Sequence, residues 1–339
     1  MVIIPKPGSY PLMSEPRQQH YIPRFYLSGF ADTRILKREG QEVIWVYEKG
    51  KEPRRSSPIK EARRRDFYSF EQDGIRRGEA EKWLGDLEDQ VAPIITTLVN
   101  ERRDLTETEK SWLALFAGIM QTRTPAGRRL SENRIDPFVN KIMKEKAADP
   151  SAFREFLEET FDPMYMPGFD IDNPQQVEQL RQEILSGKSE EISKDPQFEL
   201  ASMIEVGKKV GSVLFEMNWQ IIYNESDDLF LTSDDPVVSW RMDVEANRLY
   251  LREGVDRPNA NVWLPLCREI CLRMNKECDP RHKIWDDSSV RYINKTMVWT
   301  ADRWIFAPTR SERLKRLVDK KGGRANVDAL DLRFEGQRY

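Results

Sequence analysis

The side chain best suited to proton transfer near neutral pH is histidine, and the chain has only two. One of them, His20, lies in the segment QHYIPR, where an amide, a phenol and a guanidinium are its neighbours. We predict His20 as a catalytic general base. Gln19, Tyr21 and Arg24 are then substrate-binding neighbours. The alternative is that His20 only ties the N-terminal arm to the body of the protein.

Two charged residues border the apolar faces of two predicted helices. Glu88 follows Leu87 in an apolar stripe, and Arg123 lies seven residues after Phe116, so it continues the next helix's apolar face. Half-buried charges need partners, so we predict a Glu88–Arg123 ion pair. It either locks the two helices together or belongs to a polar pocket, with Glu88 catalytic and Arg123 bound to substrate.

Two more polar sites follow apolar segments. The sequence TSDDP over 232–236 ends a predicted strand, where paired aspartates can hold a divalent ion such as Mg²⁺ or position water. The same residues also form an ordinary turn. Asn294 lies beside Ile293 and Met297, where an amide either bonds a loop backbone or contacts a ligand.

A basic run occupies residues 51–65, KEPRRSSPIKEARRR, with seven bases and two acids. Its two prolines lead us to expect a loop that ends in a short basic helix. The run either contacts phosphate groups, those of nucleic acid included, or is a solvated face.

The composition limits the class of protein. With 57 acids and 54 bases the net charge is −3, so no overall field attracts nucleic acid or an anionic membrane. The N-terminus lacks a signal-peptide pattern and no run reaches the roughly 20 apolar residues of a membrane span, so we expect a cytoplasmic protein. HExxH, GxSxG and glycine-rich phosphate loops are also missing from the sequence.

The periodicity predicts long helices first and short strands afterwards. Helices are expected over about 78–100, from a capping box at Thr106 and Glu109 toward Pro125, over 195–217 and over 288–301. Strands are expected at 43–48, 219–224, 229–232, 237–240, 248–251, 262–266 and 270–274. This order favours an α+β fold, with a helical block packed on a mostly antiparallel sheet.

We expect one α+β domain over residues 20–318, helix-rich over 20–217 and strand-rich over 218–318. An N-terminal arm over 1–19 precedes it and a C-terminal tail over 319–339 follows it. Residues 146–195 are acid-rich and contain several prolines and glycines. They are expected to form short helices joined by loops.

The segment QHYIPR, with Leu27 and Phe30, resembles the opening signature of the domain-of-unknown-function 4238 family. Further segments resemble the pattern of this family in the same order, over about residues 18–310. They are WVYEK, DFYS, the Glu-bearing helix, QTRTP, LTSDDPV and YIN. The family is found mainly in microbes, and the resemblance carries no established activity. It implies that the polar signature positions are His20, Glu88, Gln121, Arg123, Asp234 and Asn294. Asp235 stands where the family pattern often has Asn, which leaves Asp234 as the better metal or water ligand.

Three functions remain open. The first is a hydrolase acting on a phosphate-bearing substrate or nucleic acid, with His20, Glu88 and Asp234 catalytic. Gln121, Arg123 and Asn294 would then bind substrate in one shared cavity. The second is a non-catalytic binding or defence-associated module that meets its partner through residues 51–65 or 146–195. The third is nucleotide transfer such as ADP-ribosylation, with Glu88 as the catalytic carboxylate.

Overall fold

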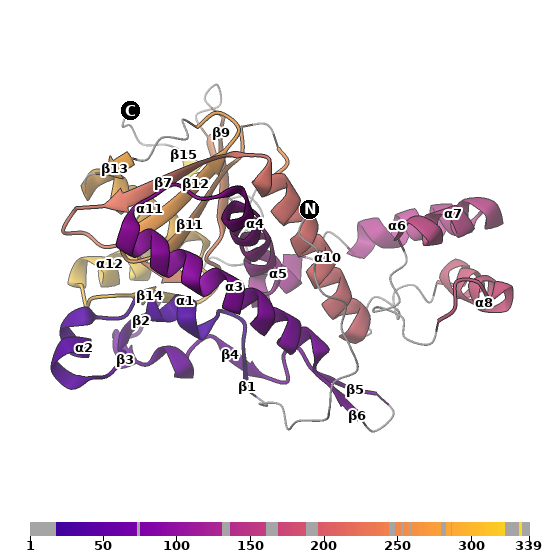
Figure 1. Cartoon of the computed structure of the whole chain (residues 1–339), viewed down its shortest axis with the longest axis horizontal. Coiled ribbons are helices and arrows are strands. Elements are labelled where there is room, and N and C mark those ends of the chain that lie inside the picture. The colour runs from indigo at the N-terminus through magenta and orange to yellow at the C-terminus, as the bar shows by residue number, and fades with distance from the viewer. Residues whose placement is uncertain are drawn as a thin grey trace.

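The computed structural model describes most of the chain (Figure 1). The described residues are 18–72, 75–130, 136–160, 169–187, 196–243, 248–251, 254–257, 259–278, 283–285, 287–322 and 332–333. The expected N-terminal arm lies outside this part except for residues 18–19, and so do stretches of the acid-rich segment and of the C-terminal tail. The fold class is α+β, as predicted.

Three long helices lie against the large sheet (Figure 1). They are α3 (Glu79–Glu101), α4 (Glu107–Thr122) and α10 (Pro196–Phe215), close to the predicted ranges. The predicted capping box is confirmed, since the Thr106 hydroxyl accepts from the Glu109 amide at 3.2 Å and the Glu109 carboxylate accepts from the Thr106 amide at 2.9 Å. Their apolar stripes form the main core with the sheet.

The large sheet has the strand order β13-β7-β12-β11-β9-β10-β15 and is antiparallel except for the β13–β7 pair. Its strands are β7 (Asn218–Asn224), β9 (Val238–Asp243), β10 (Arg248–Leu251), β11 (Asn261–Cys267), β12 (Ile270–Asn275), β13 (Lys283–Trp285) and β15 (Leu332–Arg333). Every described side chain of β11 is buried, because helices cover its face and strands flank both its edges.

A smaller antiparallel sheet joins distant parts of the chain in the order β3-β2-β14-β8. Its strands are β2 (Ile44–Glu48), β3 (Arg54–Ser56), β8 (Thr232–Ser233) and β14 (Trp304–Ala307). Helices α11 (Asp287–Thr300) and α12 (Glu312–Lys321) pack on it through a second apolar cluster. The TSDDP segment therefore begins at the edge of this sheet, beside β14.

The predicted basic helix at the end of the 51–65 run is wrong. After the 3₁₀ turn η1 (Pro58–Lys60), residues Arg63–Arg65 form strand β4, which pairs antiparallel with β1 (Gln18–His20). Left-handed backbone at Ala62 (φ 48°) and Asp66 (φ 49°) bounds the strand at both ends, which a continuing helix would not allow. We call this pair the basic ribbon.

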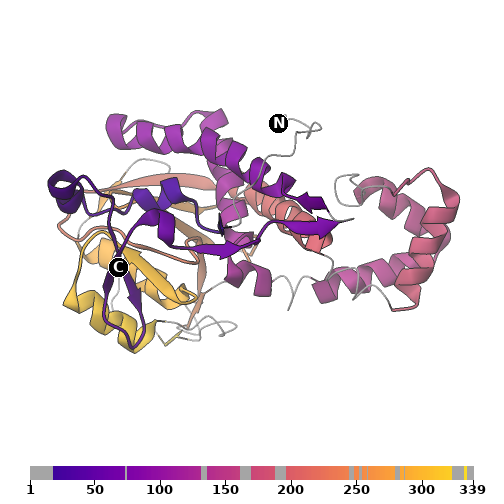
Figure 2. The ribbon, with the colours of Figure 1, turned by 90° about the horizontal axis from the view of Figure 1, so that it is seen from below.

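Short elements complete the body. They are α1 (Arg24–Ser28), α2 (Thr33–Glu39), the hairpin β5 (Phe70–Gln72) with β6 (Ile75–Arg77), and α5 (Pro125–Leu130). The helices α6 (Asp136–Ala147), α7 (Pro150–Thr160) and α8 (Pro174–Leu185) form a lobe that projects from the body in both ribbon views (Figure 2). This lobe has its own small apolar core, which includes Phe153 and Ile184.

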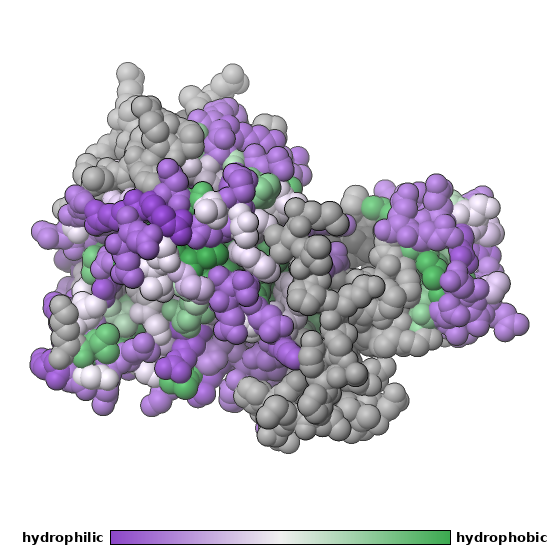
Figure 3. Space-filling model, in the orientation of Figure 1, coloured by the Kyte–Doolittle hydropathy of each residue, from purple (hydrophilic) through white to green (hydrophobic). Residues whose placement is uncertain are grey.

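Hydrophilic residues dominate the described surface on the face that Figure 3 displays, and the apolar spots there are small and scattered. Within the described part of the chain, no helix is long and apolar enough to cross a membrane.

Candidate functional site

Arg123 is the centre of a buried polar network beneath the basic ribbon. It ends α4 as its C-cap and is 1% exposed. Its guanidinium donates three hydrogen bonds, through Nε to the Tyr68 hydroxyl (3.1 Å), through Nη1 to the Glu88 carboxylate (2.9 Å) and through Nη2 to the His20 main-chain oxygen (2.7 Å). The Tyr68 hydroxyl donates in turn to the Arg123 carbonyl at 3.3 Å. One side chain thus joins β1, α3, α4 and the loop at 68.

The predicted Glu88–Arg123 ion pair is confirmed. Burial opposes the charge on Arg123, but Tyr68 and Glu88 outweigh it and raise the pKa of the guanidinium. Burial also raises the pKa of Glu88, although the nearby guanidinium opposes this shift. Glu88 keeps 23% of its side chain exposed, so only the arginine is sealed from solvent.

Gln19 holds the loop that carries Tyr68. It is fully buried, its Oε1 accepts from the Tyr68 amide at 2.6 Å, and its Nε2 donates to the Ser69 hydroxyl at 2.7 Å. Both ends of the carboxamide are therefore bound to the protein.

His20 lies on the basic ribbon with Arg63 directly opposite it on β4. Partners in an antiparallel pair share a face, so the imidazole and this guanidinium lie on the same side. The His20 Nε2 is 3.2 Å from the Ile59 carbonyl oxygen, which can only accept and so fixes the proton on Nε2. Among the described residues no group hydrogen-bonds to Nδ1, which is left as an acceptor on a partly exposed ring.

The surroundings of His20 keep its ring neutral. Burial lowers the pKa of the imidazole below its usual value of 6.5, and the Ile59 hydrogen bond opposes this shift. Positive charges lower the pKa further, those of Arg63, Arg123 and Arg24. Arg24 opens α1 with 58% of its side chain exposed and is 3.7 Å from Glu42. A neutral base among arginines is an arrangement suited to an anionic partner.

Two predicted substrate-binding residues carry buried polar atoms without a partner in the described part of the chain. These atoms are the Tyr21 hydroxyl and the Gln121 Oε1. Tyr21 is fully buried against Phe67, with ring centroids 5.8 Å apart. Burial raises the pKa of its hydroxyl, and the charge of Asp234 raises it further. A substrate can reach this hydroxyl only if its neighbours move.

Asp234 fastens the turn between β8 and β9 to the start of β14. Its carboxylate accepts three main-chain N–H bonds of 2.9–3.0 Å, from Asp302, Arg303 and Trp304. It is 1% exposed, and burial together with the charge of Asp302 raises its pKa to about 8. The carboxylate oxygens are therefore bound to backbone and do not face solvent.

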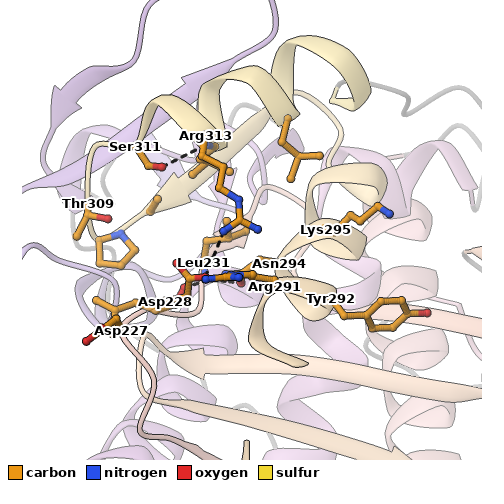
Figure 4. A pocket seen from close by; sticks show the side chains of 15 residues that line it. Asp227, Asp228, Leu231, Arg291, Tyr292, Asn294, Lys295, Thr309, Ser311 and Arg313 are labelled. Atoms are coloured by element: carbon orange, nitrogen blue, oxygen red, sulfur yellow. Dashed lines mark hydrogen bonds and ion pairs between the residues drawn. The ribbon is translucent and has the colours of Figure 1, made fainter. Parts of the chain in front are cut away.

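Asn294 lies on α11, away from this network. Its Oδ1 accepts from the Leu231 amide at 3.1 Å and its Nδ2 donates to the Leu229 carbonyl at 2.8 Å. It also lines a pocket between α11 and α12 that does not include His20, Glu88, Arg123 or Asp234 (Figure 4). The structure thus gathers His20, Glu88 and Arg123, brings Asp234 near Tyr21, and separates Asn294 from them.

The residues that the structure describes offer no group of three or more His, Cys, Asp or Glu side chains that could hold a metal ion. Glu88 is tied to Arg123, and Asp234 to backbone amides. The described residues therefore do not form the divalent-ion site that the TSDDP segment could have supplied, and the alternative of an ordinary turn fits the backbone bonds of Asp234.

Sequence reasoning missed Tyr68, whose ring lies 5.4 Å from the Arg123 guanidinium carbon and whose hydroxyl closes the network. It also did not single out Arg63 within the basic run. The pairing of β1 with β4 identifies Arg63, and no local pattern could have done so, because three consecutive arginines show no periodicity.

Of three comparisons with known proteins, one found a match. A search of the curated proteins found no match, and neither did a search of the solved structures. The model of one protein family matches residues 18–311, which include every described strand except β15 and all the residues of the network above. The chain therefore belongs to the family described as protein of unknown function (DUF4238).

Proposed function

We propose that the protein is a hydrolase acting on a phosphate-bearing substrate, nucleic acid included, with His20 as its general base. One observation carries this proposal. The Nε2 of His20 lies 3.2 Å from the Ile59 carbonyl oxygen, Nδ1 has no partner in the described part of the chain, and Arg63 lies directly opposite on β4. Burial and the charges of Arg63, Arg123 and Arg24 lower the pKa of the imidazole, which favours its neutral form. A base of this kind beside positive charge suits attack by water on a phosphate group.

In the proposed reaction Nδ1 of His20 takes a proton from a water molecule as its oxygen attacks phosphorus. The bond from phosphorus to the leaving oxygen breaks, and the imidazolium returns the proton to that oxygen. Arg63 and Arg24 bind the non-bridging oxygens, whose negative charge they stabilise in the transition state. Both guanidinium groups act on His20 electrostatically, which is consistent with a short distance between them and the ring.

The other predicted residues then hold the general base in place and do not take part in the reaction themselves. Arg123 binds the His20 carbonyl and so fixes the main chain of the base, and Glu88 compensates the buried charge of Arg123. Gln19 holds the Tyr68 loop beneath them. Gln121 keeps a substrate-binding role in the proposal because its buried Oε1 lacks a described partner.

The basic ribbon supports a polyanionic substrate. All three residues of β4 are exposed, and Arg64 lies over the Phe67 ring with its guanidinium carbon 5.7 Å from the ring centroid. Arg63 and Arg65 share one face of β4, because side chains alternate along a strand, and these two guanidinium groups can contact phosphates of a nucleic-acid strand.

A second candidate is a non-catalytic module that binds a polyanion on the same ribbon. It is favoured by the side chains of Gln19, Arg123 and Asp234, which all bind the protein itself. Charge reversal of Arg63–Arg65 would abolish polyanion binding by either the hydrolase or the binding module. Replacement of His20 would abolish turnover by the hydrolase but would leave the binding module unaffected.

The test is a cleavage assay. The full chain is incubated with single-stranded RNA, single-stranded DNA and bis(p-nitrophenyl) phosphate, with His20→Gln compared against wild type and His282→Gln as the matched control. The hydrolase proposal predicts turnover of at least one substrate and a loss of about 100-fold or more in His20→Gln alone. Binding without turnover in all three proteins would instead establish the non-catalytic module.

A further inference from the structure

The pocket between α11 and α12 is a second candidate site. None of its lining residues belongs to the surroundings of His20. Its volume is about 650 Å³, within the roughly 300–1,000 Å³ typical of small-molecule sites. It lies between the loop at 227–231, the first part of α11, the end of β14 and the first turns of α12 (Figure 4).

Part of the pocket lining is apolar. It consists of Leu229, Leu231, Ala307, Pro308, Leu314 and Leu317, which we call the leucine wall. Asn294 supports this wall, because its carboxamide bonds both Leu229 and Leu231 and so holds the loop against α11. A wall of this kind favours an organic ligand over a bare ion.

The pocket also carries two guanidinium groups around one carboxylate. Arg313 extends from the first turn of α12 toward Asp228 and Arg291, while the side chains of Lys295 and Tyr292 point away from this cluster (Figure 4). Asp228 is ion-paired with Arg291 through Nε and lies 3.5 Å from Nη1 of Arg313. An anionic group of this protein is thus already held where two arginines converge.

Two features suggest a phosphate in place of that carboxylate. A pair of guanidinium groups matches the several oxygens of a phosphate better than the two of a carboxylate. The hydroxyls of Thr309 and Ser311 also line the pocket, and α12 begins there, with Ser311 as its N-cap. The positive end of the helix dipole adds to the attraction for an anion.

We propose that this pocket binds a phosphate monoester of nucleotide size, with its phosphate between Arg291 and Arg313 and its organic part against the leucine wall. Asp228 then competes with the ligand for the same guanidinium groups. The proposal does not depend on the hydrolase proposal, since the pocket shares no residue with the surroundings of His20.

The experiment is calorimetric titration of the full chain with adenosine 5′-monophosphate, glucose 6-phosphate, inorganic phosphate and adenosine. We expect the monoesters to bind more tightly than phosphate or adenosine, since only they contact both the arginines and the leucine wall. Arg313→Ala should weaken monoester binding about tenfold or more, the loss of one charged hydrogen bond. Asp228→Asn should strengthen it by removing the competing charge.

Arg310→Ala is the matched control, because Arg310 lies nearby, is 49% exposed and does not line the pocket. Arg313 is 61% exposed, so its replacement leaves the core intact even if Arg291→Ala does not fold. His20→Gln should bind the monoesters like wild type, which separates this site from the proposed hydrolase. Absence of binding by both monoesters below about 1 mM, or equal binding by Arg313→Ala and Arg310→Ala, would overturn the proposal.

Discussion

The guanidinium of Arg123 donates to the main-chain oxygen of His20 at 2.7 Å, across 103 positions of sequence. The same arginine binds Glu88 of α3 and Tyr68, and it is sealed from solvent. A buried cation at the end of α4 therefore fixes the backbone of the one histidine that the structure describes. The ring of His20 is left on the surface side, among exposed arginines.

The first prediction concerns the pKa of His20. Arg63→Ala removes one of the positive charges that lower this pKa, so the pKa should rise toward 6.5. The measurement is an NMR titration of the imidazole Cε1–H signal, assigned with His20→Gln because the chain has two histidines. Arg65→Ala, a neighbour on β4 whose guanidinium is paired with Asp66, should raise the midpoint less than Arg63→Ala does. A wild-type midpoint above 6.5 would contradict this electrostatic picture.

The second prediction concerns the buried ion pair. Arg123→Met leaves Glu88 without its partner and the Tyr68 hydroxyl and His20 carbonyl without their donor. The free energy of unfolding should fall by about 3–5 kcal/mol, as for other broken buried pairs. Denaturant unfolding measures it. Arg102→Ala, in the exposed pair with Glu225, should cost far less. Equal losses would show that the network contributes no more than a surface contact.

The third prediction concerns Asp234 and pH. Its pKa is about 8 in the folded protein against 3.8 as the ordinary value, so the folded state holds this proton more tightly. The contribution to stability is thus full below pH 4 and is lost as pH rises toward 8, by at most about 1.4 kcal/mol per pH unit.

Comparing wild type with Asp234→Asn isolates this effect, because other groups titrate in both proteins. The stability advantage of wild type should shrink between pH 5 and pH 8 in urea unfolding. An advantage that grows with pH would mean that the three amide donors keep Asp234 ionised, with a pKa below its ordinary value.

The fourth prediction concerns the contact of α4 with α10. A Cβ added at Gly118 would lie 2.1 Å from the Gly207 carbonyl oxygen, so Gly118→Ala forces the helices apart. We expect a loss of about 1–3 kcal/mol in unfolding free energy. At Gly85 of α3 an added Cβ meets nothing within 4 Å, so Gly85→Ala should stabilise by about 0.5–1 kcal/mol. The same sign for both variants would contradict this packing.

Local patterns were enough to predict much of this fold. The apolar stripe of residues 78–100 and the Thr106 capping box gave the two helices, and their relative faces gave the Glu88–Arg123 pair. These features depend on residues close together in sequence or on one helical face, where periodicity is informative. The block order of elements likewise indicated the antiparallel sheet.

Long-range contacts were beyond such reasoning. Residues 63–65 form a strand because residues 18–20 pair with them, and the tertiary contact overrides their helical propensity. Tyr68 joins Arg123 across 55 positions, which no local spacing reveals. The side chain of Asn294 looked like a candidate for the shared cavity, but its amide holds the loop at 229–231.

The most direct test of the proposed function is the pH dependence of hydrolysis for a substrate that the wild type cleaves. The account predicts that the rate falls on the acid side with a midpoint below 6.5, equal to the pKa of His20 measured by NMR, and that this limb vanishes in His20→Gln. A His20→Gln variant that keeps the wild-type rate and the same acid limb would contradict it.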